Sequence, residues 1–137
     1  MNRQATITKM VLQYYPDAQA IYLFGSFGTE DEWPSSDVDV AVLLSPEESK
    51  KAGNMTMGKL HLALESILKM DVDIINLRNV STVFQKEIVT ADRRIYTGDS
   101  YAAEEFEMLT LSYYQKLNEE RAEIIESVVA EGRFYQA

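Results

Sequence analysis

Residues 21–44 read IYLFGSFGTEDEWPSSDVDVAVLL, and the rest of the chain is interpreted around them. An apolar run ends at Gly25-Ser26, ten mostly polar residues follow, and a second apolar run begins at Asp37-Val38-Asp39. Short continuous apolar runs bounded by turn residues favour buried β-strands. We therefore predict one strand that ends at the glycine and another that begins beside the two aspartates.

The two aspartates of this stretch point to a cation site. Asp37 and Asp39 are two residues apart, so on a strand their carboxylates share one face. Two carboxylates held together repel each other unless a cation or a proton lies between them. Mg²⁺, which proteins bind through one or two carboxylates plus substrate phosphates, meets that need. The alternative is a pair of solvated loop carboxylates, but an unpaired Asp39 at the head of a buried strand would cost several kcal/mol.

The spacing Gly-Ser, ten residues, Asp-x-Asp resembles the signature of the DNA polymerase β-type nucleotidyltransferase superfamily. The short length resembles most its minimal nucleotidyltransferase (MNT) branch, and the resemblance spans roughly residues 5–98. It implies an α/β (α+β) fold, a small mixed sheet flanked by helices. In that family a third carboxylate comes from the next strand, which VDIINL at 72–77 resembles. Asp73 matches this carboxylate by position, and Asp71 is the weaker candidate.

The resemblance also implies a two-metal reaction. Asp37, Asp39 and Asp73 would bind two Mg²⁺ ions together with the triphosphate of ATP, with Asp73 acting as ligand or as base. Gly25 would let the backbone approach the β- and γ-phosphates, and the hydroxyl of Ser26 would bond one of them. The reaction would be transfer of a nucleoside monophosphate with release of pyrophosphate.

Members of the MNT branch are typically antitoxins paired with a HEPN-type ribonuclease toxin. The resemblance therefore implies an antitoxin of a type VII-like pair that moves AMP from ATP to a tyrosine of the toxin and so inactivates it. Two alternatives stay open: an antitoxin that neutralises its toxin by binding alone, and a nucleotidyltransferase that acts on a small molecule. The complete set of aspartates favours an enzyme, and 137 residues leave no room for the additional substrate domain that small-molecule enzymes usually carry.

The chain departs from the family pattern within the ten-residue spacer. Family members commonly carry Arg-Gly there, where this sequence has Thr29-Glu30. Another basic residue could contact the triphosphate instead, and the nearest approach to a basic cluster is Lys86, Arg93 and Arg94. In the same spacer, Trp33 is interpreted as a hydrophobic plug over the loop in preference to a base-stacking residue.

Composition narrows the class of protein. The chain fits one domain, residues 1–137, with a core at about 5–98 and a C-terminal helix at about 99–131. It has no cysteine and a single histidine, His61, so thiolate and histidine-based zinc sites are not expected. No apolar run is long enough to span a membrane, and we expect a cytoplasmic protein. A net charge of −9 disfavours direct nucleic-acid binding, and suits a basic protein partner or serves solubility alone.

Apolar periodicity and capping residues predict the remaining elements. A short helical turn is expected to begin at Ser26, followed by a loop that brings the chain back to Asp37. Helices are predicted at residues 2–14, 46–52, 80–91 and about 99–131, and Ser45 is the expected N-cap of the second. A further helix is expected to begin at Asn54 as its N-cap, with an apolar stripe that includes Ile67. Strands are predicted at 20–24, 38–44 and 72–77, with a short edge strand near 93–98. The last helix would be about 50 Å long, longer than the domain needs, so part of it is expected to contact another chain.

Overall fold

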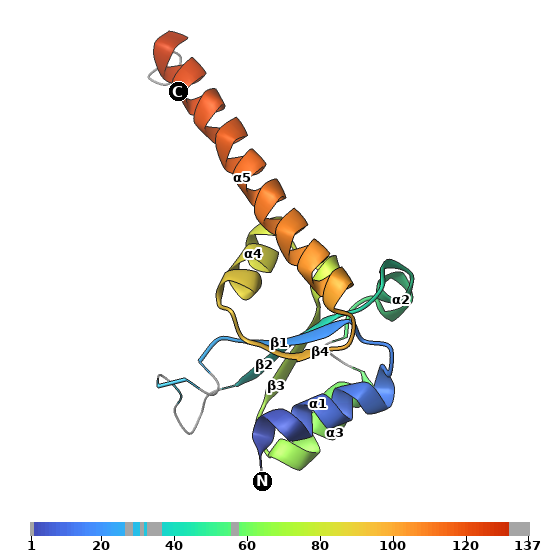
Figure 1. Ribbon diagram of the computed structural model, residues 1–137. Helices are drawn as coiled ribbons and strands as arrows, with labels where there is room; N and C mark the ends of the chain where they lie inside the picture. The colour runs from blue at the N-terminus through green and yellow to red at the C-terminus, as the bar shows by residue number, and fades with distance from the viewer. Residues whose placement is uncertain (1, 27–28, 31, 33–36, 56–57, 132–137) are drawn as a thin grey trace.

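The computed structural model of this chain describes residues 2–26, 29–30, 32, 37–55 and 58–131. Figure 1 shows a small sheet with helices on both sides and one helix that projects far beyond it. The elements in chain order are α1 (Arg3–Tyr14), β1 (Ala20–Phe24), β2 (Val38–Leu43), α2 (Pro46–Ala52), α3 (Lys59–Leu68), β3 (Val72–Asn76), the 3-10 helix η1 (Leu77–Asn79), α4 (Thr82–Thr90), β4 (Arg94–Thr97) and α5 (Ser100–Glu131).

The sheet has the strand order β3-β2-β1-β4. Strand β1 pairs antiparallel with both β2 and β4, whereas β2 and β3 run parallel. The predicted mixed sheet is therefore confirmed, and β4 lies at an edge as expected. The parallel pair needs a crossover connection, which α2 and α3 supply between β2 and β3. This crossover puts the starts of β2 and β3 at the same end of the sheet.

Both faces of the sheet are buried. Alternate residues of the strands point to opposite faces, and each face carries its own apolar cluster. Ile7 and Val11 of α1 and Leu60 and Leu64 of α3 pack on one face. Ile88 of α4 and the first turns of α5 pack on the other, and Figure 1 shows these two helix pairs on opposite sides of the strands.

Capping residues set most helix boundaries where the sequence predicts them. The Ser45 side chain accepts from the backbone N–H of Glu48 at the start of α2, as expected. The prediction that Asn54 caps the next helix is wrong. Helix α3 begins at Lys59 with Gly58 as its N-cap residue. The chain after Asn54 is instead anchored by Met55, which is 4% exposed and belongs to the core. The helix therefore begins later than a cap at Asn54 would place it.

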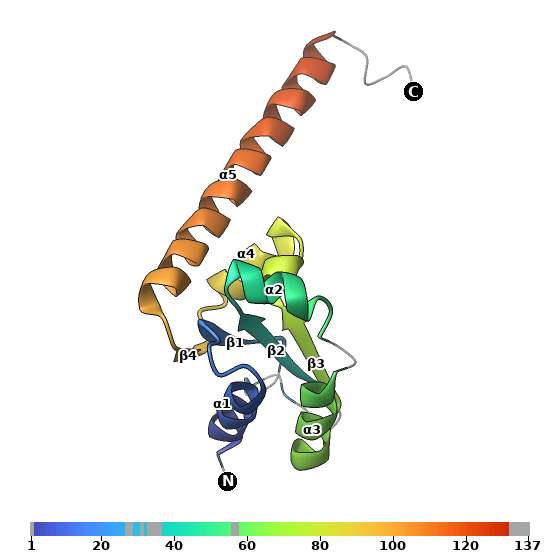
Figure 2. The ribbon, with the colours of Figure 1, turned by 90° about the vertical axis from the view of Figure 1, so that its right-hand side faces the viewer.

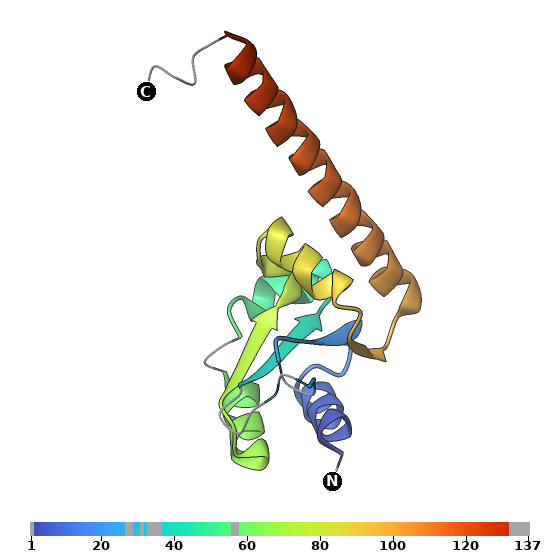
Figure 3. The same cartoon turned by 90° about the vertical axis from the view of Figure 1, so that its left-hand side faces the viewer.

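Helix α5 is much longer than its contact with the sheet. Its 32 residues correspond to about 48 Å. Ala103, Phe106 and Thr110 are buried, whereas Ile124 and Ile125 are each 63% exposed. Figures 2 and 3 show, from opposite sides, that the helix leaves the body after its first turns. The predicted overhang is therefore present, and its exposed side chains include large apolar ones.

No helix in the described part of the chain combines the length and the apolar character needed to cross a membrane.

Candidate active site

The three predicted aspartates come together at one end of the sheet. Asp39 of β2 and Asp73 of β3 are register partners on the parallel pair, so they are neighbours across the two strands. Ala41 and Ile75, two residues further along, belong to the cluster under α4 and α5, which assigns both aspartates to that same face. Asp37 lies exposed, directly before β2. The structure thus brings together residues that are far apart in the sequence.

The charges of Asp73 and Asp37 act on the carboxylate of Asp39. The pKa of Asp39 is raised to about 6, chiefly by burial and then by the negative charges of Asp73 and Asp37. The positive charge of Arg93 acts in the opposite direction and lowers the pKa of Asp39. A partly buried carboxylate between two others favours a bound cation, because a cation offsets both the burial and the repulsion.

Gly25 forms the wall of this site at the end of β1. Its φ is +72°, and a Cβ at this position would overlap the carboxylate of Asp39. Only glycine allows the backbone to come this close in this conformation. Arg93 lies beside this turn, and its Nη1 donates to the carbonyl oxygen of Gly25 at 2.7 Å.

The polar spacer is partly described. The backbone N–H of Thr29 donates to the carbonyl oxygen of Ser26 at 3.0 Å, a bond three residues back along the chain, as expected for a short helical turn that begins at Ser26. Further along, Glu32 accepts two hydrogen bonds from the guanidinium of Arg3, at 2.7 and 2.9 Å, so the spacer is tied to the start of α1. The interpretation of Trp33 as a plug falls outside the described residues.

The three basic residues proposed from the sequence, Lys86, Arg93 and Arg94, do not form one cluster in the structure. Lys86 lies over the ring of Tyr114, 4.8 Å from its centroid, and Arg94 donates to Glu107 at 2.8 Å. Both therefore contact α5. Arg93 alone of these three bonds to the glycine turn.

Two aromatic side chains near the carboxylates were not singled out from the sequence. Phe24 is the register partner of Asp39, and its ring packs edge-to-face against Phe84 of α4 with centroids 5.5 Å apart. Local sequence carries no signal for this pair, because it depends on how α4 folds back over β1.

The donor set fits a hard cation that also needs substrate oxygens. Within the described part of the chain, no group of three or more His, Cys, Asp or Glu side chains lies in an arrangement that could hold a metal ion by itself. Mg²⁺ does not require one, because it is usually held by one or two carboxylates, water and substrate phosphates. The neighbouring carboxylates of Asp39 and Asp73, with Asp37 beside them, suit such an open site.

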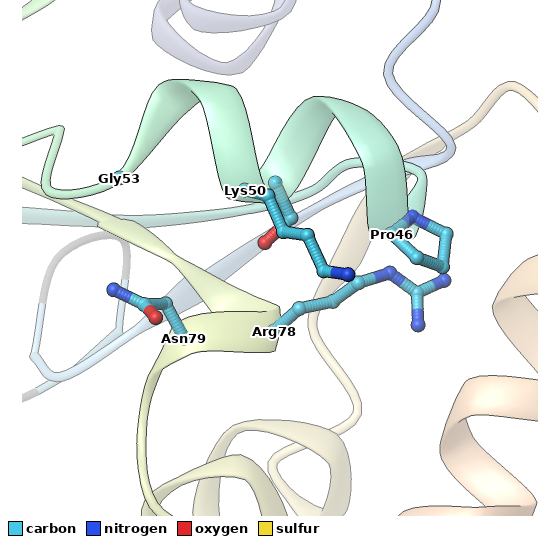
Figure 4. A pocket seen from close by; sticks show the side chains of 6 residues that line it. Pro46, Lys50, Gly53, Arg78 and Asn79 are labelled. Atoms are coloured by element: carbon cyan, nitrogen blue, oxygen red, sulfur yellow. The ribbon is translucent and has the colours of Figure 1, made fainter.

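A separate pocket lies at the opposite end of the sheet, where β2 and β3 end. It measures about 450 Å³ and is lined by Pro46, Ser49, Lys50, Gly53, Arg78 and Asn79. Figure 4 shows Lys50 and Arg78 reaching across it between α2 and η1. The guanidinium of Arg78 bonds the carbonyl oxygen of Leu44 and, at 2.8 Å, the side chain of Gln19. Arg78 thus joins structural elements, and the predicted site residues do not line this pocket.

Comparison with known families matches residues 6–101 to the model described as polymerase beta, nucleotidyltransferase. This range contains the glycine turn, the three aspartates and all four strands. The chain belongs to the polymerase beta nucleotidyltransferase family. As the resemblance implied, this nucleotidyltransferase has a small mixed sheet flanked by helices.

One curated relative of this nucleotidyltransferase is similar over almost its whole length. Protein adenylyltransferase MntA of Shewanella oneidensis is 36% identical over 124 residues, which covers 90% of this chain and 86% of that protein. A crystal structure of a toxin–antitoxin complex with AMP-PNP matches with a TM-score of 0.70 and 34% identity, covering 92% of this chain and 98% of that one. A structure of a tri-AMPylated Shewanella oneidensis HEPN toxin in complex with MNT antitoxin matches with a TM-score of 0.65 and 34% identity, covering 93% and 96%.

Proposed function

We propose that this protein is the antitoxin of a type VII-like toxin–antitoxin pair and that it transfers AMP from ATP to a tyrosine of a cognate HEPN-type ribonuclease toxin. The modification would inactivate the toxin. The observation that carries the proposal is the similarity to a protein adenylyltransferase over 90% of the chain. In the same chain, Asp39 and Asp73 are register partners, with Asp37 beside them.

In this proposal Asp37, Asp39 and Asp73 hold two Mg²⁺ ions together with the triphosphate of ATP. Such ions neutralise charge on the attacking and leaving oxygens of an in-line displacement. A bond forms between the tyrosine oxygen and the α-phosphorus, the bond from the α-phosphorus to the bridging oxygen breaks, and pyrophosphate leaves. Asp73 serves as ligand or accepts the phenolic proton, since it stands next to Asp39 on the neighbouring strand.

The glycine turn gives the phosphates room. Gly25 brings the backbone against the carboxylate of Asp39, so a triphosphate bound there would meet backbone and metal ligands together. In this proposal the hydroxyl of Ser26, in the same turn, would bond a phosphate oxygen. The protein contributes positioning and charge neutralisation, which are the main requirements of phosphoryl-type transfer.

The outer part of α5 is assigned to the toxin. Its exposed apolar residues, Ile124 and Ile125, lie well beyond the part of the helix that packs on the sheet. The proposal treats residues 1–137 as one domain and places it in the cytoplasm, because the reaction consumes ATP and its target is a ribonuclease. It involves no direct contact with nucleic acid.

The test is transfer of label from α-³²P-ATP with Mg²⁺ to the HEPN-type protein that co-purifies with this chain. We expect label on that partner with the wild type and none with Asp37→Ala/Asp39→Ala. Asp73→Ala should also abolish labelling, whereas Asp71→Ala, two residues earlier, is the matched control and should retain it. Absence of label with the wild type, while the double variant still silences the partner's ribonuclease activity, would overturn the catalytic reading in favour of neutralisation by contact.

A further inference from the structure

Arg93 is held against the end of β1 by its backbone and by its side chain. Its carbonyl oxygen accepts from the backbone N–H of Leu23 at 2.9 Å, and its Nη1 donates to the carbonyl oxygen of Gly25 at 2.7 Å. A long side chain fixed in this way has already lost much of its rotamer freedom, so little more is lost when a ligand binds. The guanidinium is therefore preorganised beside the glycine turn.

The other basic residues near the sheet are committed elsewhere. Lys86 and Arg94 contact Tyr114 and Glu107 of α5. The ten residues between Ser26 and Asp37 contain neither lysine nor arginine. Positive charge at the turn must therefore come from a distant part of the chain, and Arg93 is the residue that the fold brings there.

We propose that Arg93 positions the Gly25–Ser26 turn and contacts the phosphates beyond the α-phosphate of the bound nucleotide. The inference rests on the proposed function and names a residue of the same site. A nucleoside triphosphate carries its charge into a site that already contains three carboxylates, and metal ions balance only part of that charge. A guanidinium is suited to the remainder, because its planar fork matches two oxygens of a phosphate.

The experiment measures binding with the full-length chain and Mg²⁺, using two probes. The first is α,β-methylene-ATP, which cannot transfer AMP, and the second is AMP, titrated to millimolar concentration by NMR. The variants are Arg93→Gln, which removes the charge, and Arg93→Lys, which keeps it without the fork. Lys51→Gln is the matched control, because it makes the same charge change at the exposed end of α2.

We expect Arg93→Gln to weaken binding of α,β-methylene-ATP about tenfold or more while AMP binding changes little, since a charge-assisted bond to phosphate is lost. Arg93→Lys should give an intermediate affinity, and Lys51→Gln should bind as the wild type does. An equal loss for both probes would mean that Arg93 only supports the turn, which would overturn the proposal. Unchanged affinity for both probes would overturn it as well.

Labelling of the partner separates this inference from the proposed function. If Arg93→Gln transfers AMP with an unchanged KM for ATP, the inference fails and the proposed function stands. If the wild type binds α,β-methylene-ATP through Arg93 but labels no protein, the inference stands and the proposed function fails. The thermal unfolding midpoint of each variant, compared with the wild type, verifies that the variants are folded.

Discussion

Gly25 packs directly against the carboxylate of Asp39, with a positive φ of +72° and no space for a Cβ between them. Gly25 directly follows β1 and Asp39 lies in β2, and this contact closes one side of the candidate site. Asp39 thus has two neighbours from distant parts of the sequence: Gly25 in the turn after β1 and Asp73 on the parallel strand β3.

Gly25→Ala should reduce AMP transfer at least about 100-fold, because the added methyl group displaces the Asp39 carboxylate and small displacements of reacting groups are costly. Stability should fall by about 1–2 kcal/mol from the positive φ. The matched control is Gly53→Ala. Gly53 also has a positive φ, of +57°, but a Cβ there would meet nothing within 4 Å. The Gly53→Ala variant should be less stable than the wild type but should transfer AMP normally at temperatures below its unfolding transition. Equal loss of activity in both variants would contradict the assignment.

The metal-free protein should become less stable as pH rises through the range in which Asp39 ionises. Its pKa is raised from 3.8 to about 6 in the folded state, chiefly by burial, so the folded state binds this proton more tightly than the unfolded state does. The stabilisation is complete below about pH 4 and is lost as pH rises through about 6. Asp39→Asn should flatten this part of the profile.

Denaturant midpoints measured in EDTA between pH 4 and pH 8 test this prediction. The difference between wild type and Asp39→Asn isolates the contribution of Asp39 from those of the other carboxylates. Adding Mg²⁺ should stabilise the wild type most at the alkaline end, because the ion binds the ionised form. Parallel profiles for the two proteins would show that the folded environment does not disfavour the Asp39 charge.

Glu107→Ala should cost about 2–3 kcal/mol of stability, because Glu107 joins α5 to the sheet. Its Oε2 accepts from the hydroxyl of Tyr22 at 2.6 Å and from Nη1 of Arg94 at 2.8 Å. Tyr22 is 1% exposed, so its hydroxyl would be left buried without this acceptor. Glu104→Ala, an exposed position on the same helix, should stay within about 0.5 kcal/mol of the wild type. Equal urea midpoints for the two variants would refute the role of Glu107.

Ile124→Lys should weaken binding of the partner about tenfold or more without changing the thermal stability of the isolated chain. The side chain is 63% exposed on the projecting part of α5, so the folded chain loses little when it becomes polar. Burial of an apolar side chain against a partner is lost, and a charge is placed in the contact. Asn118→Lys adds the same charge on the same helix and serves as the control. Titration of the partner by calorimetry distinguishes the two, and identical affinities would place the contact elsewhere.

Local sequence predicted the elements well where a single signal dominated. Continuous apolar runs placed β1 and β2, and the Ser45 cap placed α2. It failed at the start of α3, because Asn54 is a good N-cap residue only if the chain can turn into a helix there. In the structure Met55 lies in the core before the helix begins, and Gly58 occupies the N-cap position. The stripe on α3 also predicted burial of Ile67, and this prediction is wrong, because the side chain is 41% exposed.

The sequence by itself determined the two apolar strands, the glycine between them, the paired Asp37 and Asp39, and thereby the family. These features lie within 24 residues, and their chemistry follows from spacing alone. Only the tertiary structure decided that Asp73 stands beside Asp39 and that Arg93, 68 residues from Gly25, bonds to its carbonyl oxygen. Such contacts depend on strand order and register. Because these arise from pairing between distant segments, local periodicity does not predict them.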